Sequence, residues 1–397
     1  MVMIGDSTGR AARSALLDEV IRDVVAPLAR EVDEKGLFPE EAVRALGDIG
    51  LLALTIPVED GGAGASAAEL GDVVLRLATA CASTAMVYVM HVTALNSFLA
   101  LPQGSLRSGY LTRIREERLL VTEAISEPGS GSQWWSVEST AERIDGGYRI
   151  EADKSFSTSA GHADLYVVST RTPGSDNDRD HAVFAIGADE GRIESGEWKG
   201  LGLAGNSSTW ITFRADVGEE ALLYSGSGGA GLRTYNEANQ PLYHLGVSAA
   251  YLGIATAAYR ACLDRIRTRR YSGNPSGFGA NLSQYPIARR HIGTMSIRLE
   301  ATRGLVEGLA RAIDEEQGLD EMAVLMTATK VAAAEAAAEI AQEAMMASGG
   351  VAYSRGFLPI ERHLRDALAA SLMGPNDDFC KELIGRLEIE GSSYHDL

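Results

Sequence analysis

Residues 122–132 read TEAISEPGSGS, and residues 154–164 read KSFSTSAGHAD. The first stretch leads from an extended apolar run into a loop of serines and glycines. Such a loop exposes backbone N–H groups and hydroxyls that can bind a phosphate or the polar edge of a ring. The second stretch follows an expected strand hairpin and carries two hydroxyls, Ser157 and Thr158, beside Phe156. Ser/Gly loops are more often plain turns, so the first stretch alone is a weak signal for a ligand site.

The residue pattern of the surrounding sequence changes twice, from helical to strand-like and back to helical. Between residues 121 and 223, short β-branched runs such as DLYVVST and TWITFRA alternate with turn sequences such as PGSDNDRD, which is typical of strands joined by tight turns. Before this region, apolar residues recur with helical spacing. After the Ser/Gly-rich residues 225–231, four long helical segments are expected, at residues 241–270, 286–316, 320–347 and 359–390.

These patterns predict an α+β protein that is mainly α-helical. We expect an N-terminal helical domain over residues 1–118, a central β-barrel or β-sandwich domain over residues 119–226, and a C-terminal four-helix bundle over residues 227–397. The length of 397 residues is ample for a hydrophobic core without disulfides or structural metals.

Composition excludes several classes of function. The net charge of -18, from 36 basic and 54 acidic residues, argues against nucleic acid, because phosphate binding requires clustered Lys and Arg. The three cysteines are far apart and the seven histidines lack metal-ligand spacing, so we expect no disulfide, no metal and a cytoplasmic protein. The most apolar stretch, residues 77–101, contains several polar residues and is expected to be a buried helix, not a membrane span. Motifs of dinucleotide-binding, P-loop, zinc-protease and α/β-hydrolase proteins are absent from the sequence.

Four motifs in this order resemble those of the acyl-CoA dehydrogenase superfamily, whose members bind FAD. SEPGSGS resembles the family's TEPxAGSD loop, and KSFSTSAGHAD resembles KxxITNGxxAD. WKGLGLAGNSSTWITFRADV resembles the end of the family's β-domain, and GGVAYSRGFLPIERHLRDA resembles GGxGYxxxxPxERxxRDA. The resemblance covers most of the chain and implies the family's helical, β and helical order of domains.

The resemblance also implies which residues bind FAD. Ser126 corresponds to a Thr that bonds the pyrimidine edge of the flavin, Phe156 to a Trp that packs on its ring, and Thr158 to a hydroxyl facing N5. Ser132 corresponds to a residue of the phosphate-facing loop. The remaining matches would contact the FAD of a neighbouring subunit, which implies a homodimer or homotetramer; they are Arg270, Phe278, Gly349 and Gly350.

The family's catalytic carboxylate is missing. Family members that desaturate acyl thioesters need a base for the α-proton. The usual Glu position is Gly374, and the alternative position on the first helix of the bundle is Tyr243, whose phenol, with a pKa of about 10, is a poor base. Asp377, the adjacent Asp378, or His244 are the candidates for a replacement base, although the two aspartates also suit the N-terminus of a helix.

Three functions therefore follow from the resemblance. The first is an FAD-dependent oxidoreductase that oxidises an acyl thioester, carried by CoA or an acyl carrier protein, in specialised metabolism. Its electron acceptor would be an electron-transfer flavoprotein. The second is a monooxygenase of the same fold that uses reduced flavin from a flavin reductase and needs no base; the residues inserted before Phe278 and the phrase NLSQYPIARRHIG favour it. The third is an inert flavin-binding paralogue.

Overall fold

The computed structural model describes residues 7–131, 133–273 and 277–396, so the expected phosphate-loop residue Ser132 lies outside the described residues. The N-terminal part is helical, as the sequence predicts. Its helix α1 continues through a π-helical turn at Ile21–Val25 into α2, and four further helices follow. They are α1 (Ser7–Val20), α2 (Ala26–Lys35), α3 (Glu40–Asp48), α4 (Ala67–Ala80), α5 (Ala82–Leu99) and α6 (Ser105–Glu117).

The middle of the chain forms two four-stranded sheets with the orders β1-β4-β5-β8 and β2-β3-β7-β6. The strand β1 runs parallel to β4, whereas the other neighbours are antiparallel. Strand β3 alternates buried and exposed side chains, as expected for a sheet with one face on the core. The strands are β1 (Val121–Ala124), β2 (Thr140–Ile144), β3 (Gly147–Ser157), β4 (Leu165–Arg171), β5 (His181–Gly187), β6 (Arg192–Ser195), β7 (Thr209–Gly218) and β8 (Leu222–Ser225).

The C-terminal part contains the expected bundle with two differences. Helix α7 begins at Ala230, eleven residues before the expected start at Pro241, which lies inside the helix. The fourth expected helix is divided by residues 369–376, because Pro375 has no N–H to donate and Asn376 caps the next helix, its side chain accepting from Phe379 N at 2.9 Å. The helices are α7 (Ala230–Thr268), α8 (Pro286–Asp314), α9 (Leu319–Ser348), α10 (Gly350–Tyr353), α11 (Ile360–Leu368) and α12 (Asp377–Glu390).

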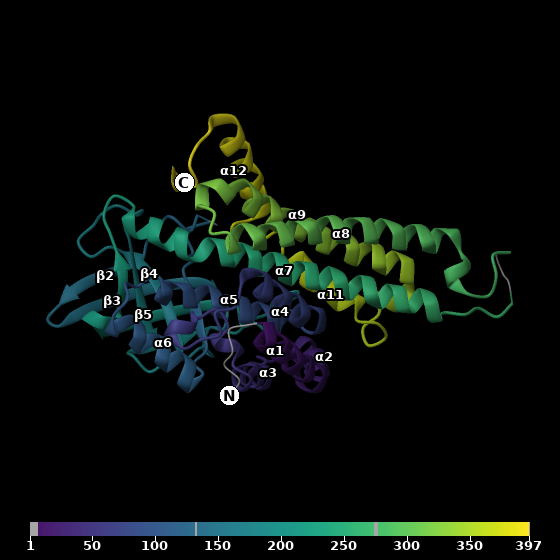
Figure 1. Cartoon of the computed structure of the whole chain (residues 1–397), viewed down its shortest axis with the longest axis horizontal. Coiled ribbons are helices and arrows are strands. Elements are labelled where there is room, and N and C mark those ends of the chain that lie inside the picture. Colours follow the sequence, from purple (N-terminus) through teal and green to yellow (C-terminus); the bar gives the residue numbers. More distant parts are fainter. Residues whose placement is uncertain (1–6, 132, 274–276, 397) are drawn as a thin grey trace.

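The three long helices α7, α8 and α9 lie lengthwise, with the strands gathered at one end of the molecule (Figure 1). Helix α5 packs against both α7 and β1, so it joins the bundle to the sheets. It is buried on all sides, with sixteen of its eighteen residues buried, which is typical of a helix in the centre of a core. In the described part of the chain, no helix combines the length and apolar character that spanning a membrane requires.

Candidate functional site: a cavity between the sheets and the bundle

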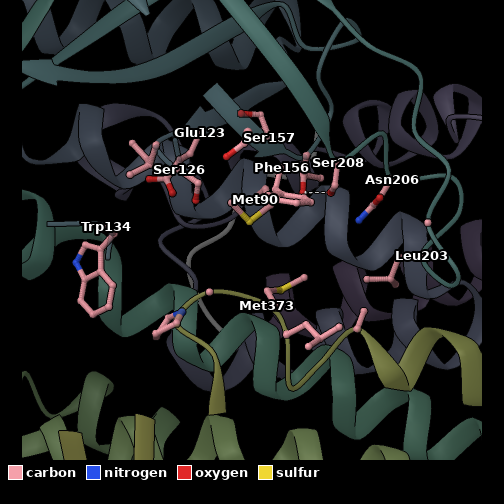
Figure 2. A pocket seen from close by; sticks show the side chains of 18 of the residues that line it. Met90, Glu123, Ser126, Trp134, Phe156, Ser157, Leu203, Asn206, Ser208 and Met373 are labelled. Carbon is pink, nitrogen blue, oxygen red and sulfur yellow. Dashed lines mark hydrogen bonds between the residues drawn. The ribbon is translucent and has the colours of Figure 1, made fainter. Parts of the chain in front are cut away.

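A cavity of about 770 Å³ lies where the β-domain, helix α5, helix α7 and the segment after α11 meet. Its size falls in the range of small-molecule and cofactor sites. Figure 2 shows the side chains around it: Ser126, Ser157 and Phe156 come from the β-domain, and Met373 comes from the opposite side. The residues between α11 and α12, which divide the fourth helix, thus form one wall of the cavity.

The wall on the β-domain is made at the end of β3, where the strand becomes irregular. The register of β3 against β7 shifts between Lys154 and Ser157, and Phe156 has a left-handed φ of 53°. Such a bulge turns a side chain away from the sheet, and Phe156 is 73% exposed. Beyond it, the hydroxyls of Thr158 and Ser208 share a hydrogen bond of 2.7 Å.

An internal ion pair holds the Ser/Gly loop against the sheet. The side chains of Lys154 and Glu127 are almost completely buried, with Lys154 Nζ 2.5 Å from Glu127 Oε1. The Glu127 carboxylate also accepts from the backbone N–H groups of Glu138 and Ser139. Burial raises the pKa of Glu127, but Lys154 and these hydrogen bonds lower the pKa overall. The loop is therefore anchored at the point where it meets the cavity.

The opposite wall is held by a second buried ion pair. Lys330 Nζ of α9 lies 2.8 Å from Asp377 Oδ1 and donates to the Met373 carbonyl at 3.2 Å. The Tyr243 hydroxyl donates to the carbonyl of Gly374. These three contacts fix the segment that replaces the middle of the fourth helix.

A third wall comes from residues 198–206, which connect β6 with β7. The Leu203 N–H donates to Asp366 Oδ1 at 2.7 Å, and burial raises the pKa of Asp366 to about 6 although this hydrogen bond opposes the shift. A Cβ built on Gly202 would lie 2.2 Å from the Arg365 carbonyl oxygen, so this close approach requires glycine. The segment is thereby held against α11.

Glu123 is the buried carboxyl group of the cavity wall that has no ion-pair partner among the described residues. It lies on β1, and its Oε2 accepts from the Tyr235 hydroxyl at 3.2 Å, whereas its Oε1 has no hydrogen-bond partner. Burial raises the pKa of Glu123 to about 8, because the hydrogen bond from Tyr235 only partly offsets the loss of water. The surroundings of Glu123 therefore favour its protonated form.

The residues predicted for catalysis lie in different surroundings. Gly374 and Tyr243 line the cavity. Burial, followed by the nearby Glu123, raises the pKa of Tyr243. His244 is buried, shares a hydrogen bond of 2.9 Å between Nδ1 and the Gln240 carbonyl, and has a pKa lowered by burial to about 4. Asp377 is paired with Lys330 and, like His244, is not part of the cavity wall.

The predicted flavin-binding residues fall into two groups. Ser126, Phe156 and Thr158 line the cavity. The second group lies outside it, in the segment after α7 and at the end of α9. There, Arg270 forms an isolated bridge with Asn281, and Phe278 packs near Tyr285 with ring centroids 5.8 Å apart. Gly349 and Gly350 follow α9 in this second group.

Comparisons with known proteins agree with this architecture. Models of the N-terminal, middle and C-terminal domains of acyl-CoA dehydrogenases match residues 10–117, 122–215 and 242–387. Cyclohexane-1-carbonyl-CoA dehydrogenase of Geobacter metallireducens is 32% identical over 359 residues, which cover 88% of this chain and 89% of that protein. The chain belongs to the acyl-CoA dehydrogenase family. Members of this family bind a flavin, FAD or FMN.

Solved structures of this fold include both a dehydrogenase and a monooxygenase. Butyryl-CoA dehydrogenase of Megasphaera elsdenii superposes with a TM-score of 0.87 at 22% identity, covering 96% of this chain and 98% of the other. Methanesulfinate monooxygenase MsuC of Pseudomonas fluorescens superposes with a TM-score of 0.83 at 23% identity, covering 97% of both chains. These likenesses show the acyl-CoA dehydrogenase fold.

The cavity fits the flavin of the acyl-CoA dehydrogenase family. Its β-domain wall offers hydroxyls and an aromatic ring, and two buried polar atoms of this wall, Ser157 Oγ and Asn206 Oδ1, have no hydrogen-bond partner within the protein. Buried polar atoms normally have partners, so these atoms are suited to the polar edge of a bound ring system. In the described ranges, no cluster of three or more His, Cys, Asp or Glu side chains is arranged to hold a metal.

Sequence reasoning missed several residues of this site. Glu123, Ser157 and Asn206 line the cavity, but the motif comparison assigned roles only to their neighbours. One signal was available: Glu123 is a charged residue in the otherwise apolar run that precedes the Ser/Gly loop. No local sequence pattern predicts that Asn206 lines the cavity, because its position depends on the packing of residues 198–206 against α11.

Proposed function

We propose that this protein is an FAD-dependent oxidoreductase that oxidises an acyl thioester, bound to CoA or to an acyl carrier protein, in specialised metabolism. The observation that carries the proposal is the cavity itself. Ser126 of the SEPGSGS motif and Thr158 of the KSFSTSAGHAD motif line the same cavity as Gly374. The 32% identity to a dehydrogenase of an acyl-CoA supports the same reaction class.

In this proposal the β-domain wall holds the flavin. Ser126 and Thr158 would bond its polar edge, Phe156 would pack on its ring, and Ser132 would approach its phosphates. When bound, the flavin supplies the acceptor for the two electrons that leave the substrate. The acyl group would lie on the other side, with its reacting carbons beside Gly374 and Tyr243.

The base for the α-proton remains a prediction at Asp377, Tyr243 or His244. The three residues differ in whether their polar atoms already have a partner. The Asp377 carboxylate is paired with Lys330, and the Tyr243 hydroxyl donates to Gly374, whereas His244 Nε2 is buried without a hydrogen-bond partner. Of the three, His244 has an unpartnered ring nitrogen, but burial lowers its pKa to about 4 and it lies outside the cavity wall.

Anaerobic mixing with acyl thioesters tests the function. We expect the absorbance of the oxidised flavin to bleach when the protein is mixed with a matching acyl-CoA or acyl-carrier thioester, because the substrate delivers its electrons in the absence of oxygen. A panel of saturated, branched and cyclic acyl groups in both carrier forms covers the substrate class. Free carboxylic acids of the same acyl groups serve as the control, because they lack the thioester that acidifies the α-carbon.

A monooxygenase that uses reduced flavin is the second candidate. It is favoured by Gly374, which removes the family's usual carboxylate from the wall, and by the fold shared with a monooxygenase. A flavin that stays oxidised with every thioester, together with oxygen consumption when a flavin reductase supplies reduced flavin, would identify this function. A purified protein that binds flavin but shows neither reaction would identify an inert flavin-binding paralogue.

We also propose that the protein is a homodimer or homotetramer. Large apolar side chains are exposed at the end of the bundle where α8 begins and α9 ends, two ends joined by a hydrogen bond of 2.7 Å between His291 and Glu343. These exposed side chains are Phe278, Ile287, Met346 and Tyr353. Arg270, Gly349 and Gly350 lie in the same segments, where they would contact the FAD of a neighbouring subunit. Exposed apolar patches of this kind commonly mark interfaces.

Light scattering on the purified protein is expected to give the mass of a dimer or a tetramer. The substitution Met346→Asp introduces a charge into the patch and should shift the protein toward the monomer and lower its FAD content. The same substitution at an exposed site of another face, Leu106→Asp on α6, should change neither. A monomeric wild type with a full complement of FAD would contradict the proposal.

The same proposal implies which partners the protein has and where in the cell it acts. An electron-transfer flavoprotein would accept electrons from the dehydrogenase, and a flavin reductase would serve the monooxygenase instead. Nucleic acid and membranes are not expected as partners. The three cysteines are buried and free, which suits a reducing compartment such as the cytoplasm.

A further inference from the structure

Glu123 differs from every other charged residue in the described wall of the cavity. The wall contains three charged side chains, Glu123, Glu127 and Arg365. Glu127 is paired with Lys154, and Arg365 is paired with Asp33 at 2.6 Å and also with Glu361. No Lys, Arg or His in the described part of the chain forms an ion pair with Glu123, and its Oε1 has no hydrogen-bond partner.

The surroundings of Glu123 contain phenols but no counter-charge. Tyr235 of α7 donates to Glu123 Oε2. Tyr224 of β8 is engaged with Ser97 through a hydrogen bond of 3.1 Å, and Tyr243 is engaged with the Gly374 carbonyl. Glu123 raises the pKa of all three phenols, after burial itself, so each keeps its proton and remains neutral.

A carboxyl group is rarely buried without a partner, because removing its charge from water is costly. Glu123 therefore presents an unsatisfied acceptor to a cavity whose other acidic wall residue is neutralised. The group that fits Oε1 is a positively charged donor, since a cation both supplies the missing hydrogen bond and compensates the carboxylate.

Glu123 and Tyr243 line the same cavity. After burial, the nearby Glu123 raises the pKa of Tyr243, and Tyr243 contacts the Gly374 segment, beside which the proposed function puts the reacting carbons. A cation paired with Glu123 would therefore lie in the same space as the acyl group.

We propose that Glu123, held by Tyr235, binds a protonated amine of the substrate. This inference rests on the proposed function for the thioester, and it narrows the substrate class to acyl groups that carry an ammonium. Binding is accompanied by proton release: the neutral carboxyl group of the free protein loses its proton to solvent, and the resulting carboxylate pairs with the ammonium.

A pair of simple probes tests the inference without depending on turnover. Hexylamine and 1-hexanol have the same chain and differ in the charged group. We expect the FAD-loaded protein to bind hexylamine at least about tenfold more tightly than hexanol at pH 7. Calorimetry in buffers of different ionisation enthalpy should show proton release when the amine binds, because burial raises the pKa of Glu123 and favours its protonated form in the free protein.

Variants separate recognition from folding. Glu123→Gln keeps an acceptor for Tyr235 but removes the charge, so it should bind both probes equally and release no proton. Glu151→Gln, the same change at an exposed position of β3, should leave the tenfold preference intact. Tyr235→Phe should weaken amine binding at pH 7, because losing the hydrogen bond raises the pKa of Glu123. Binding should recover at higher pH, where Glu123 loses its proton. A merely structural effect would weaken binding at every pH.

A ladder of pantetheine thioesters then connects the inference to the proposed function. Acyl groups of increasing length with a terminal amine are compared with methyl-terminated groups of equal length, and the flavin absorbance is followed anaerobically. Amine binding without flavin reduction by any thioester would retain the inference and reject the thioester function. Flavin reduction without an amine preference would retain the function and reject the inference. Equal binding of hexylamine and hexanol, no measurable amine binding, or a preference that persists in Glu123→Gln would also overturn it.

Discussion

Replacing Lys154 by Met should lower the free energy of unfolding by about 3–5 kcal/mol, because the Glu127 carboxylate would remain buried without its counter-charge. Lys154 is fully buried, and its Nζ also donates to Ser169 Oγ at 3.1 Å. Methionine fills a similar volume without a charge. Urea denaturation followed by circular dichroism measures the change, which we expect to be among the largest for a single substitution in the β-domain.

The loss should extend to flavin retention, because the same carboxylate anchors the Ser/Gly loop through the backbone of Ser139. It should also depend on pH. The pKa of Glu127 is lower in the folded protein than in the unfolded chain, so its stabilisation is present above about pH 4.3 and is lost as the pH falls through the folded-state value. The difference between wild type and variant should therefore shrink in acid.

The exposed pair of Lys199 and Glu197, with 2.8 Å between Nζ and Oε2, supplies the matched control. Lys199→Met makes the same chemical change where water screens the charges, so we expect little effect on unfolding. If Lys154→Met unfolded at the same denaturant concentration as wild type, the buried pair would not anchor the loop as we describe.

Replacing Asp377 by Ala should also cost about 3–5 kcal/mol, because Lys330 would be left buried and unpaired. Lys330 additionally donates to the Met373 carbonyl, so the Gly374 wall should loosen and flavin or ligand binding should weaken. Asp378→Ala is the control, since Asp378 is exposed one residue further along α12. In thermal unfolding at neutral pH, the melting temperature of Asp377→Ala should lie well below those of wild type and of this control.

The double variant Asp377→Leu with Lys330→Met separates structure from catalysis. It removes both charges, so most of the lost stability should return. If flavin reduction by a thioester also returns, Asp377 is an element of the wall and not the base. A stable double variant that binds flavin and thioester but leaves the flavin oxidised would make Asp377 the base, in agreement with one of the three sequence predictions.

The order of elements could be predicted because it is encoded locally. Helical spacing, β-branched runs and turn sequences indicate their own structures, and four motifs in order indicate the family. The division of the fourth helix at residues 369–376 was less evident, because helical residues continue on both sides of Gly374 and Pro375. The early start of α7 was hidden by Pro241, which usually indicates a helix beginning.

The site was predictable only where a motif marks it. Ser126, Phe156 and Thr158 were expected from their motifs and line the cavity. Glu123 was not expected, because its importance depends on its surroundings in the fold. Among the described residues it has no counter-charge, and one of its oxygens has no hydrogen-bond partner. Similarly, the pairing of Asp377 with Lys330 joins residues 47 positions apart, and no local pattern distinguishes such an aspartate from a free one.

The walls of the cavity have a consequence for how the protein is made. They include Met90 of α5, the β-domain, α7 and Pro375, so they draw on most of the polypeptide. A growing chain on the ribosome cannot enclose the cavity until residue 375 has emerged and α12 has brought Asp377 to Lys330. Cofactor capture must therefore follow the synthesis of α12, and translation intermediates that stop before α12 should be apoproteins.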